Sequence, residues 1–321
     1  MPCVVGPDPE TDESLSGFVP RLAEANGYDR PSGLFGILHG TTTNLSGRYI
    51  SKSIAEAVAG LAGLDPDSLV SRAYTGCSER AGRATFYGVE LSSSQISAAR
   101  PKLCPDCLLG RPILQAAWDL ALWVVCPHQG CYLINRCQFC GSPIEWERSG
   151  VALCHHCGSP LTSVSGGTAE EPAVELSLQM ANLVPVLSRE MRRSKFAERL
   201  RDLNIRSLVD LVKFVGSPPR AKRLSRRKVT PTQARSVFKN AAEVLDTWPE
   251  GYHRFVKQWE LFDPAAFKLA LAQELSDPAL HYSVQDQRPM SALLLKDAYL
   301  RISMRERSPD TGQVHLLQCC R

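Results

Sequence analysis

The chain has 321 residues, of which 44% are hydrophobic and 22% are charged, with a formal net charge of +4 and twelve cysteines. This composition is typical of globular proteins with two or three small domains, and it excludes collagen-like, mucin-like and prion-like chains. No secretory signal is visible, and no apolar run reaches the ~20 residues that a membrane span needs. We therefore expect a cytoplasmic protein without membrane contact, in which clustered cysteines bind metal rather than form disulfides.

The first predicted helix lies near the start of the chain. Leu15, Phe18 and Leu22 recur at helical spacing and form an apolar stripe that faces a core. Asp12 is the candidate N-cap, and Asn26-Gly27 is suited to end the helix.

A second helix is predicted from Ser53, whose hydroxyl and the side chain of Glu56 match a capping box. Gly63 breaks this helix, and Pro66 is suited to the first position of a third. Two short helices across such a turn are compatible with a helix-turn-helix, the usual reader of DNA. The helix predicted from Pro66 carries Asp67 as well as Arg72, so its charge is poorly suited to contact phosphates. We therefore favour packing or protein contact over binding in a DNA groove.

The segment of residues 112–125 is apolar on nearly all sides. A segment without a polar face is buried in a globular protein, so Trp118 and Trp123 should lie in the core. Only Gln115 and Asp119 interrupt the run. They are four residues apart and would share one face of a helix, where they could bond to each other or to a neighbouring backbone group.

The cysteines are concentrated in one part of the chain, since eight of the twelve lie between Cys104 and Cys157. Six of these eight form three Cys-x-x-Cys pairs. Cysteines at i and i+3 followed by glycine form a tight knuckle, in which backbone amides donate to the thiolates and both sulfurs point at one Zn²⁺. The predicted ligands are Cys104, Cys107, Cys126, His128, Cys137, Cys140, Cys154 and Cys157.

Two structural zinc ions are predicted. In the simplest, sequential pairing, Cys104, Cys107, Cys126 and His128 bind one ion, and Cys137, Cys140, Cys154 and Cys157 bind the other. An interleaved arrangement, in which each ion takes alternate pairs, uses the same residues and stays open. Cys131 is the alternative to His128, because a thiolate binds zinc at least as well as an imidazole. Four protein ligands leave a tetrahedral zinc no open position, so both ions should be structural.

Beyond the cysteines, the chain becomes rich in Ser, Gly and Glu over residues 163–171, which is typical of a linker. Helical apolar spacing resumes over residues 176–186 and 196–215. Thr230-Pro231 begins a further helix, because threonine is a good N-cap and proline fits the first turn.

A basic strip, defined as residues 211–242, contains no acid. Its densest part could neutralise several phosphates, with salt-dependent but sequence-independent affinity. The alternative is a solvated loop. Residues 1–160 carry 12 Lys and Arg against 15 Asp and Glu, whereas residues 161–321 carry 25 against 18, so any contact with nucleic acid belongs to the second part. The candidate contacts are Arg220, Lys222, Arg223, Arg226, Arg227 and Lys228.

The order of these features resembles the TniQ family, over about residues 10–255. The similar motifs are Asp12-Glu13-Ser14-Leu15, Cys104-Pro105-Asp106-Cys107-Leu108, Val125-Cys126-Pro127, Leu133-Ile134-Asn135-Arg136-Cys137-Gln138-Phe139-Cys140-Gly141 and Trp248-Pro249-Glu250-Gly251-Tyr252. One position departs from the pattern. The family usually has a histidine three residues after the cysteine equivalent to Cys126, where this chain has Gln129, so His128 or Cys131 would replace that ligand.

The resemblance implies a non-catalytic adaptor in DNA transposition. Members of the family connect a target-recognition module, in some cases an RNA-guided CRISPR complex, to an AAA+ ATPase that recruits the transposase. The implied partners are this ATPase, the targeting complex with its guide RNA, and target DNA within the assembly. Whether the chain is a homodimer stays open.

Two other functions are alternatives to the adaptor. A zinc-ribbon DNA-binding protein, either a sequence-specific target selector or a transcription regulator, would use the basic strip and the helix-turn-helix. An enzyme is not expected, because no Walker-type phosphate loop, Ser/His/Asp arrangement or His-Glu-x-x-His helix is present. The expected fold is mainly α with small zinc-ribbon or zinc-knuckle β elements. It divides into a helical domain over residues 1–100, a double zinc finger over 101–162 and a helical domain over 172–321.

Overall fold

The computed structural model describes most of the chain up to residue 262. The described residues are 5–36, 52–74, 83–97, 100–188, 191–201, 203–217 and 229–262. Within these ranges the fold is helix-rich and contains two small two-stranded sheets, in agreement with the predicted class. None of the helices described is long and apolar enough to cross a membrane.

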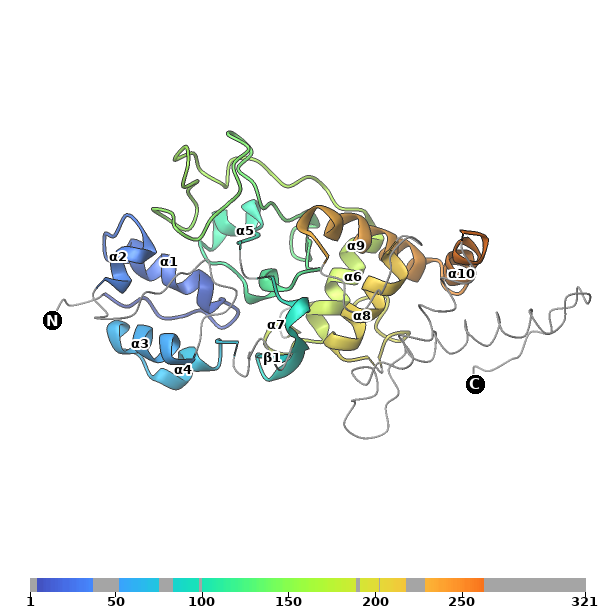
Figure 1. Cartoon of the computed structure of the whole chain (residues 1–321), viewed down its shortest axis with the longest axis horizontal. Helices are drawn as coiled ribbons and strands as arrows, with labels where there is room; N and C mark the ends of the chain where they lie inside the picture. Colours follow the sequence, from blue (N-terminus) through green and yellow to red (C-terminus); the bar gives the residue numbers. More distant parts are fainter. Residues whose placement is uncertain are drawn as a thin grey trace, which may run out of the picture.

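Four helices form one end of the molecule, on the left of Figure 1: α1 (Leu15–Ala25), α2 (Pro31–Phe35), α3 (Lys52–Ala62) and α4 (Pro66–Val70). The N-cap of α1 is Ser14, whose side chain accepts a hydrogen bond from the Gly17 amide. The prediction of Asp12 as N-cap is wrong, because Asp12 lies two residues too early. The helix ends as predicted, with Asn26 as the C-cap.

The helix pair predicted after residue 50 is present, since α3 and α4 pack against each other. α3 begins at Lys52, so Ser53 lies inside the helix and not at its N-cap. Pro66 begins α4 as predicted, and the Asp65 side chain caps it by accepting from the Asp67 amide. α4 is only five residues long, and the helix-turn-helix stays a prediction.

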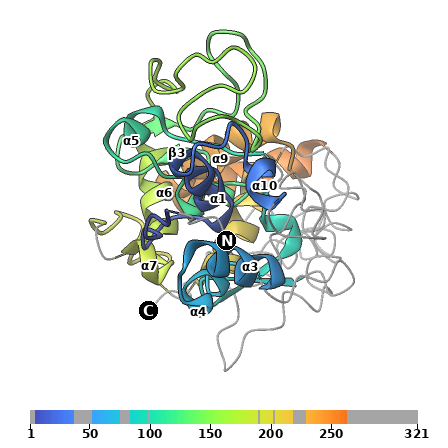
Figure 2. The same cartoon turned by 90° about the vertical axis from the view of Figure 1, so that its left-hand side faces the viewer.

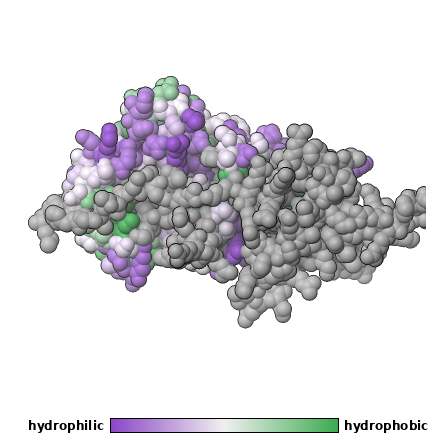
Figure 3. Space-filling view, viewed as in Figure 1, coloured by the Kyte–Doolittle hydropathy of each residue, from purple (hydrophilic) through white to green (hydrophobic). Residues whose placement is uncertain are grey.

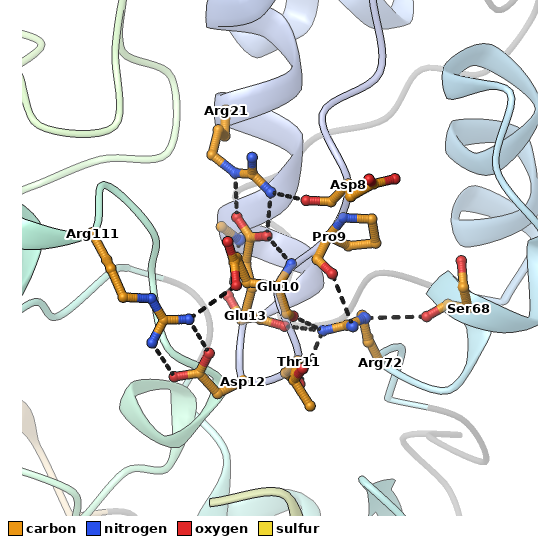
Figure 4. A network of polar contacts seen from close by, with 12 residues as sticks. Asp8, Pro9, Glu10, Thr11, Asp12, Glu13, Arg21, Ser68, Arg72 and Arg111 are labelled. Carbon is orange, nitrogen blue, oxygen red and sulfur yellow. Dashed lines mark hydrogen bonds and ion pairs between the residues drawn. The ribbon is translucent and has the colours of Figure 1, made fainter. Parts of the chain in front are cut away.

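Arginines fix the segment before α1 to three parts of the fold (Figure 4). Glu13 is 0% exposed, and its carboxylate accepts hydrogen bonds from Arg21 of α1 at 2.8 and 2.6 Å. Arg72, just after α4, donates to several backbone carbonyls of the segment, including that of Glu13 at 3.1 Å. Arg111, which follows the first Cys-x-x-Cys pair, binds Asp12 at 2.8 Å. These contacts join α1, α4 and the cysteine-rich region.

A hairpin and one single-turn helix lead into the cysteine-rich region: β1 (Arg83–Phe86), β2 (Val89–Ser92) and η1 (Ser93–Gln95). A second single-turn helix, η2 (Ala116–Asp119), lies between the first two groups of cysteines. The strands are antiparallel, with Arg83 opposite Ser92. Gln95 is fully buried, and its amide donates to the Asp210 carboxylate at 2.9 Å, which ties the hairpin to the C-terminal helices.

Residues 112–125 are mostly buried, but they do not form the α-helix that would place Gln115 and Asp119 on one face. Asp119 instead accepts a hydrogen bond from the Tyr74 hydroxyl at 2.6 Å. The backbone of Gln115 forms a bridge with Glu13. Because the segment is apolar all round, its sequence predicts burial but not conformation.

The cysteine-rich region contains α5 (Pro105–Gly110), β3 (Val125–Cys126) and β4 (Cys131–Tyr132). β3 and β4 are antiparallel, with Cys126 opposite Cys131. The predicted linker packs on the same hairpin: the Tyr132 amide donates to the Gly167 carbonyl at 2.9 Å, and the Ala169 amide donates to the Gly130 carbonyl at 2.8 Å.

The C-terminal helices are α6 (Glu171–Asn182), α7 (Pro185–Ser188), α8 (Ile205–Gly216), α9 (Pro231–Asp246) and α10 (Glu250–Phe262). Thr230 caps α9 in a capping box with Gln233, which confirms the predicted start. The helix expected over residues 196–215 begins only at Ile205, because Asn204 caps it there. The Trp248–Pro249 peptide bond is cis.

One set of buried apolar contacts runs through these elements, from Leu15 in α1 to Val256 in α10. α1–α4 lie at one end of the long axis and α6–α10 towards the other (Figure 1). The loops between β4 and α6 rise above this helical body in both views (Figures 1 and 2). The cysteine-rich region therefore sits between the helical ends and projects from them on one side.

Candidate metal centres

The second cysteine cluster, defined as Cys137, Cys140, Cys154 and Cys157, brings two Cys-x-x-Cys pairs together. Its four sulfurs all lie within 4.8 Å of one another. The Cys137 and Cys157 sulfurs are 3.7 Å apart, and so are those of Cys140 and Cys154. A disulfide would place them about 2.0 Å apart. With zinc–sulfur bonds of about 2.3 Å, the edge of a tetrahedron is about 3.8 Å, which matches the observed spacing.

The two knuckles of the second cluster repeat the same backbone hydrogen bonds. In the first, the Gly141 amide donates to the Cys137 carbonyl at 2.9 Å, and the Cys137 amide donates to the Ser142 carbonyl at 2.8 Å. The same two bonds recur in the second knuckle, where Gly158 and Cys154 donate at 2.9 and 3.0 Å. Both glycines have φ near +70°, a conformation that other residues adopt at a cost.

Two serines support the exposed thiols of this cluster, although the cysteine spacing does not indicate them. Hydrogen bonds from the side chain and backbone of Ser142 lower the pKa of the Cys140 thiol. The equivalent bonds from Ser159 lower the pKa of the Cys157 thiol to about 6. Both favour the thiolate, which is the form that binds metal. The repeated Gly-Ser-Pro after each pair is the sequence signal that could have identified these serines.

The first cysteine cluster, defined as Cys104, Cys107, Cys126 and Cys131, is more buried. The Cys104 sulfur lies 3.4 Å from that of Cys131, and the Cys107 sulfur lies 3.4 Å from that of Cys126. Cys107 lies in α5 and Cys104 is its N-cap, while the β3–β4 hairpin supplies the other two thiols. The Cys-x-x-Cys pairs are thus grouped sequentially along the chain, and the interleaved arrangement is not formed.

The structure brings Cys131, and not the favoured His128, to the first cluster. His128 is exposed, and none of the groups of potential ligands found in the described residues includes it. The reason lies in the β3–β4 turn. The Gly130 amide donates to the Cys126 carbonyl at 2.9 Å, as in the other knuckles, and Gly130 has φ +60°. The chain then returns directly opposite Cys126 and presents Cys131.

Both clusters fit a metal ion. The second brings four sulfurs within 4.8 Å of one another, whereas in the first Cys104, Cys107 and Cys126 form one group of potential ligands and Cys131 joins Cys104 in another that includes Asp106. Sulfurs are the preferred ligands of structural zinc, and no water or substrate position remains in a four-thiolate tetrahedron. The donor set is suited to holding the chain together rather than to catalysis. His155 and His156 are exposed on the second knuckle and do not join the groups of potential ligands described.

The basic strip is only partly described. Its candidate contacts, residues 220–228, lie outside the described residues. Of its other members, Lys213 is buried, with its ammonium 3.5 Å from the Ser94 hydroxyl. The Arg235 guanidinium lies 4.0 Å from the centre of the Tyr132 ring, and Lys239 pairs with Glu170. These three side chains make contacts within the protein and do not form a continuous basic face.

Comparison with known proteins identifies a family. The model of the TniQ family matches residues 4–133, which confirms the resemblance over this part of the chain. The match contains all four cysteines of the first cluster and ends before the second. No curated protein matches the chain.

Proposed function

The TniQ family model matches residues 4–133 of this chain, and on that basis we propose that it is a TniQ-type, non-catalytic adaptor in DNA transposition. It connects a target-recognition complex, for which an RNA-guided CRISPR effector is one candidate, to an AAA+ ATPase that recruits the transposase. The family match is the observation that carries this proposal. The closed geometry of both cysteine clusters supports it, because such sites stabilise a scaffold and leave no position for a reaction.

In this role each cluster holds one Zn²⁺ through four thiolates. A structural zinc site supplies folding free energy that a small segment with few apolar contacts lacks. This applies best to the loops of the second cluster, which project from the helical body (Figure 2).

The surface near the clusters is suited to protein contact. Leu109 and Phe139 are 75% and 58% exposed, and each lies in or beside a Cys-x-x-Cys knuckle. Figure 3 shows a largely hydrophilic surface over this part of the molecule, with a small hydrophobic tip at the top. Single exposed apolar residues are common on protein surfaces, but aromatic side chains are enriched at interfaces, so Phe139 is the better candidate for such a contact.

We predict that Cys154→Ser removes one of two zinc ions and abolishes transposition by disrupting the scaffold. Losing one thiolate opens the second cluster, and its loops lose their main stabilising element. Zinc per chain, measured by atomic emission, should fall from two to one. Co-purification with the proposed AAA+ ATPase partner should fall with it.

Cys77→Ser is the matched control, because Cys77 is outside the predicted ligand set. It should retain two zinc ions and full transposition. The structural role of the second cluster would be contradicted if Cys154→Ser protein were soluble, held two zinc ions and supported transposition at the wild-type level.

The DNA-binding alternative makes a different prediction, which concerns the basic strip. Replacing Arg220, Arg223, Arg226 and Arg227 with alanine should weaken binding to nucleic acid. It should also reduce the slope of log affinity against log salt concentration, because fewer counterions are released from the nucleic acid when fewer phosphates are contacted. Zinc content should not change. Binding of duplex DNA by the wild-type chain alone at physiological salt would favour the DNA-binding protein. If the variant bound nucleic acid with the same affinity and the same salt dependence as the wild type, the basic strip would have no role in either function.

A further inference from the structure

Arg148 is a buried charge that forms no ion pair with any of the residues that the structure describes. It lies in the segment that joins the two knuckles of the second cluster, and it is 2% exposed. Its Nε donates to the carbonyls of Gly150 and Val151, both at 3.1 Å, and its Nη1 donates to the carbonyl of Glu145 at 2.6 Å. Its Nη2 is buried and has no hydrogen-bond partner in the described residues. None of the ion pairs described includes it.

Such an arrangement is unfavourable unless a negative charge lies nearby. Removing a guanidinium from water costs several kcal/mol, and neutral carbonyls compensate only in part. Burial lowers the pKa of Arg148 to about 10, while the charges of Glu24 and Cys154 act in the opposite direction. Glu24 is exposed, and its carboxylate accepts from the Val151 amide at 3.0 Å. Cys154, in contrast, is buried and belongs to the cluster.

We propose that Arg148 is the counter-ion of the second cluster, a positioning residue that neutralises a dianionic metal centre. This inference rests on the proposed binding of zinc. Four thiolates and one Zn²⁺ carry a net charge of −2, and two of the thiolates, Cys137 and Cys154, are buried. The hydrogen bonds that hold Arg148 in place also fix the loop between the two knuckles. The positive charge therefore lies in the same loop that the metal would hold in position.

The test compares charge with hydrogen bonding in the full-length, zinc-loaded chain. Arg148→Met removes the charge and the donors, whereas Arg148→Lys keeps the charge but cannot reproduce three backbone hydrogen bonds. The rate at which Cys140 and Cys157 become alkylated in the presence of a chelator, followed by mass spectrometry, reports release from this cluster alone. We expect Arg148→Met to weaken metal retention by about 10–100-fold, the range for residues that support a ligand. Arg148→Lys should restore most of it.

Arg72→Met is the matched control. Arg72 also donates to backbone carbonyls, those of the segment before α1 (Figure 4). Its loss should lower the free energy of unfolding without changing alkylation at Cys140 and Cys157 in the folded protein.

A double-mutant cycle separates electrostatics from a purely structural role. Cys157→His makes the centre a monoanion, so the effect of Arg148→Met should shrink by about threefold or more in that background. An undiminished effect, or equal loss in the Met and Lys variants, would overturn the inference while leaving the metal centre intact. If the wild-type second cluster bound no zinc, the metal centre and the counter-ion would both be refuted.

Discussion

Asp119 shows how one buried side chain makes stability depend on pH. Burial raises its pKa to about 7, against the opposing hydrogen bond from Tyr74 and the charge of Lys102. The folded-state pKa lies above the value of 3.8 expected in the unfolded chain. The folded protein therefore binds more protons between pH 4 and 7, and its stability falls as the pH rises through that window.

We predict that Asp119→Asn removes this fall, because asparagine still accepts from Tyr74 but cannot ionise. Near pH 7 the variant should be more stable than the wild type by roughly 1–4 kcal/mol, with little difference near pH 4.5. Urea unfolding of the zinc-loaded protein across this range measures the effect. Asp29→Asn, at an exposed position, is the control. If the free energy of unfolding varied with pH in the same way in the wild type and in Asp119→Asn, the Asp119 carboxylate would not be the cause of the pH dependence.

At the scale of elements, the pairing of the predicted linker with β4 depends on close backbone approach. A Cβ atom added at Gly166 would lie 1.7 Å from the Tyr132 carbonyl oxygen. We predict that Gly166→Ala destabilises the protein by about 1–3 kcal/mol, because the backbone must move apart. Gly60→Ala is the control, because Gly60 lies in α3 and a Cβ atom added there would meet nothing within 4 Å. It should stabilise by roughly 0.5–1 kcal/mol in urea unfolding. If both substitutions changed the free energy of unfolding equally, the close approach of Gly166 to the Tyr132 carbonyl would be contradicted.

The elements also show what sequence alone predicts. Some local signals succeed: Thr230 caps α9, and the Cys-x-x-Cys pairs form knuckles, because each depends on neighbours within four residues. Others do not, since Ser14 and not Asp12 caps α1, and Ser53 lies inside α3. Signals that need tertiary context fail. The exchange of His128 for Cys131 follows from the return of the chain at the β3–β4 turn, and Lys213 is buried although it belongs to the basic strip.

At the scale of the whole molecule, the two clusters differ in exposure. Cys104, Cys126 and Cys131 are buried in the first cluster, whereas Cys140 and Cys157 are exposed in the second. We predict that a chelator removes metal in two phases, the second cluster first, because its sulfurs are accessible from solvent. Zinc release with peptide-level alkylation measures the order. Simultaneous alkylation of Cys104 and Cys140 would contradict it.

The proposed metal binding would also change the charge of the molecule. Two Zn²⁺ held by eight thiolates would lower the formal net charge of +4 by four, to zero. The acidic first part would become more acidic, and the difference in charge from the basic second part would increase. A loaded adaptor of this kind would rely on local surfaces rather than on net charge to attract its partners.

The repeated knuckles make the outer face of the second cluster modular. Gln138-Phe139 and His155-His156 occupy the same two positions in loops with the same hydrogen bonds, and all four side chains are exposed. The cysteines, glycines and serines form the candidate metal site, so the dipeptide between each pair of cysteines could change without altering that site. Related chains could then bind different partners by exchanging only the two residues between the cysteines of a knuckle, while the backbone of the knuckle stays the same.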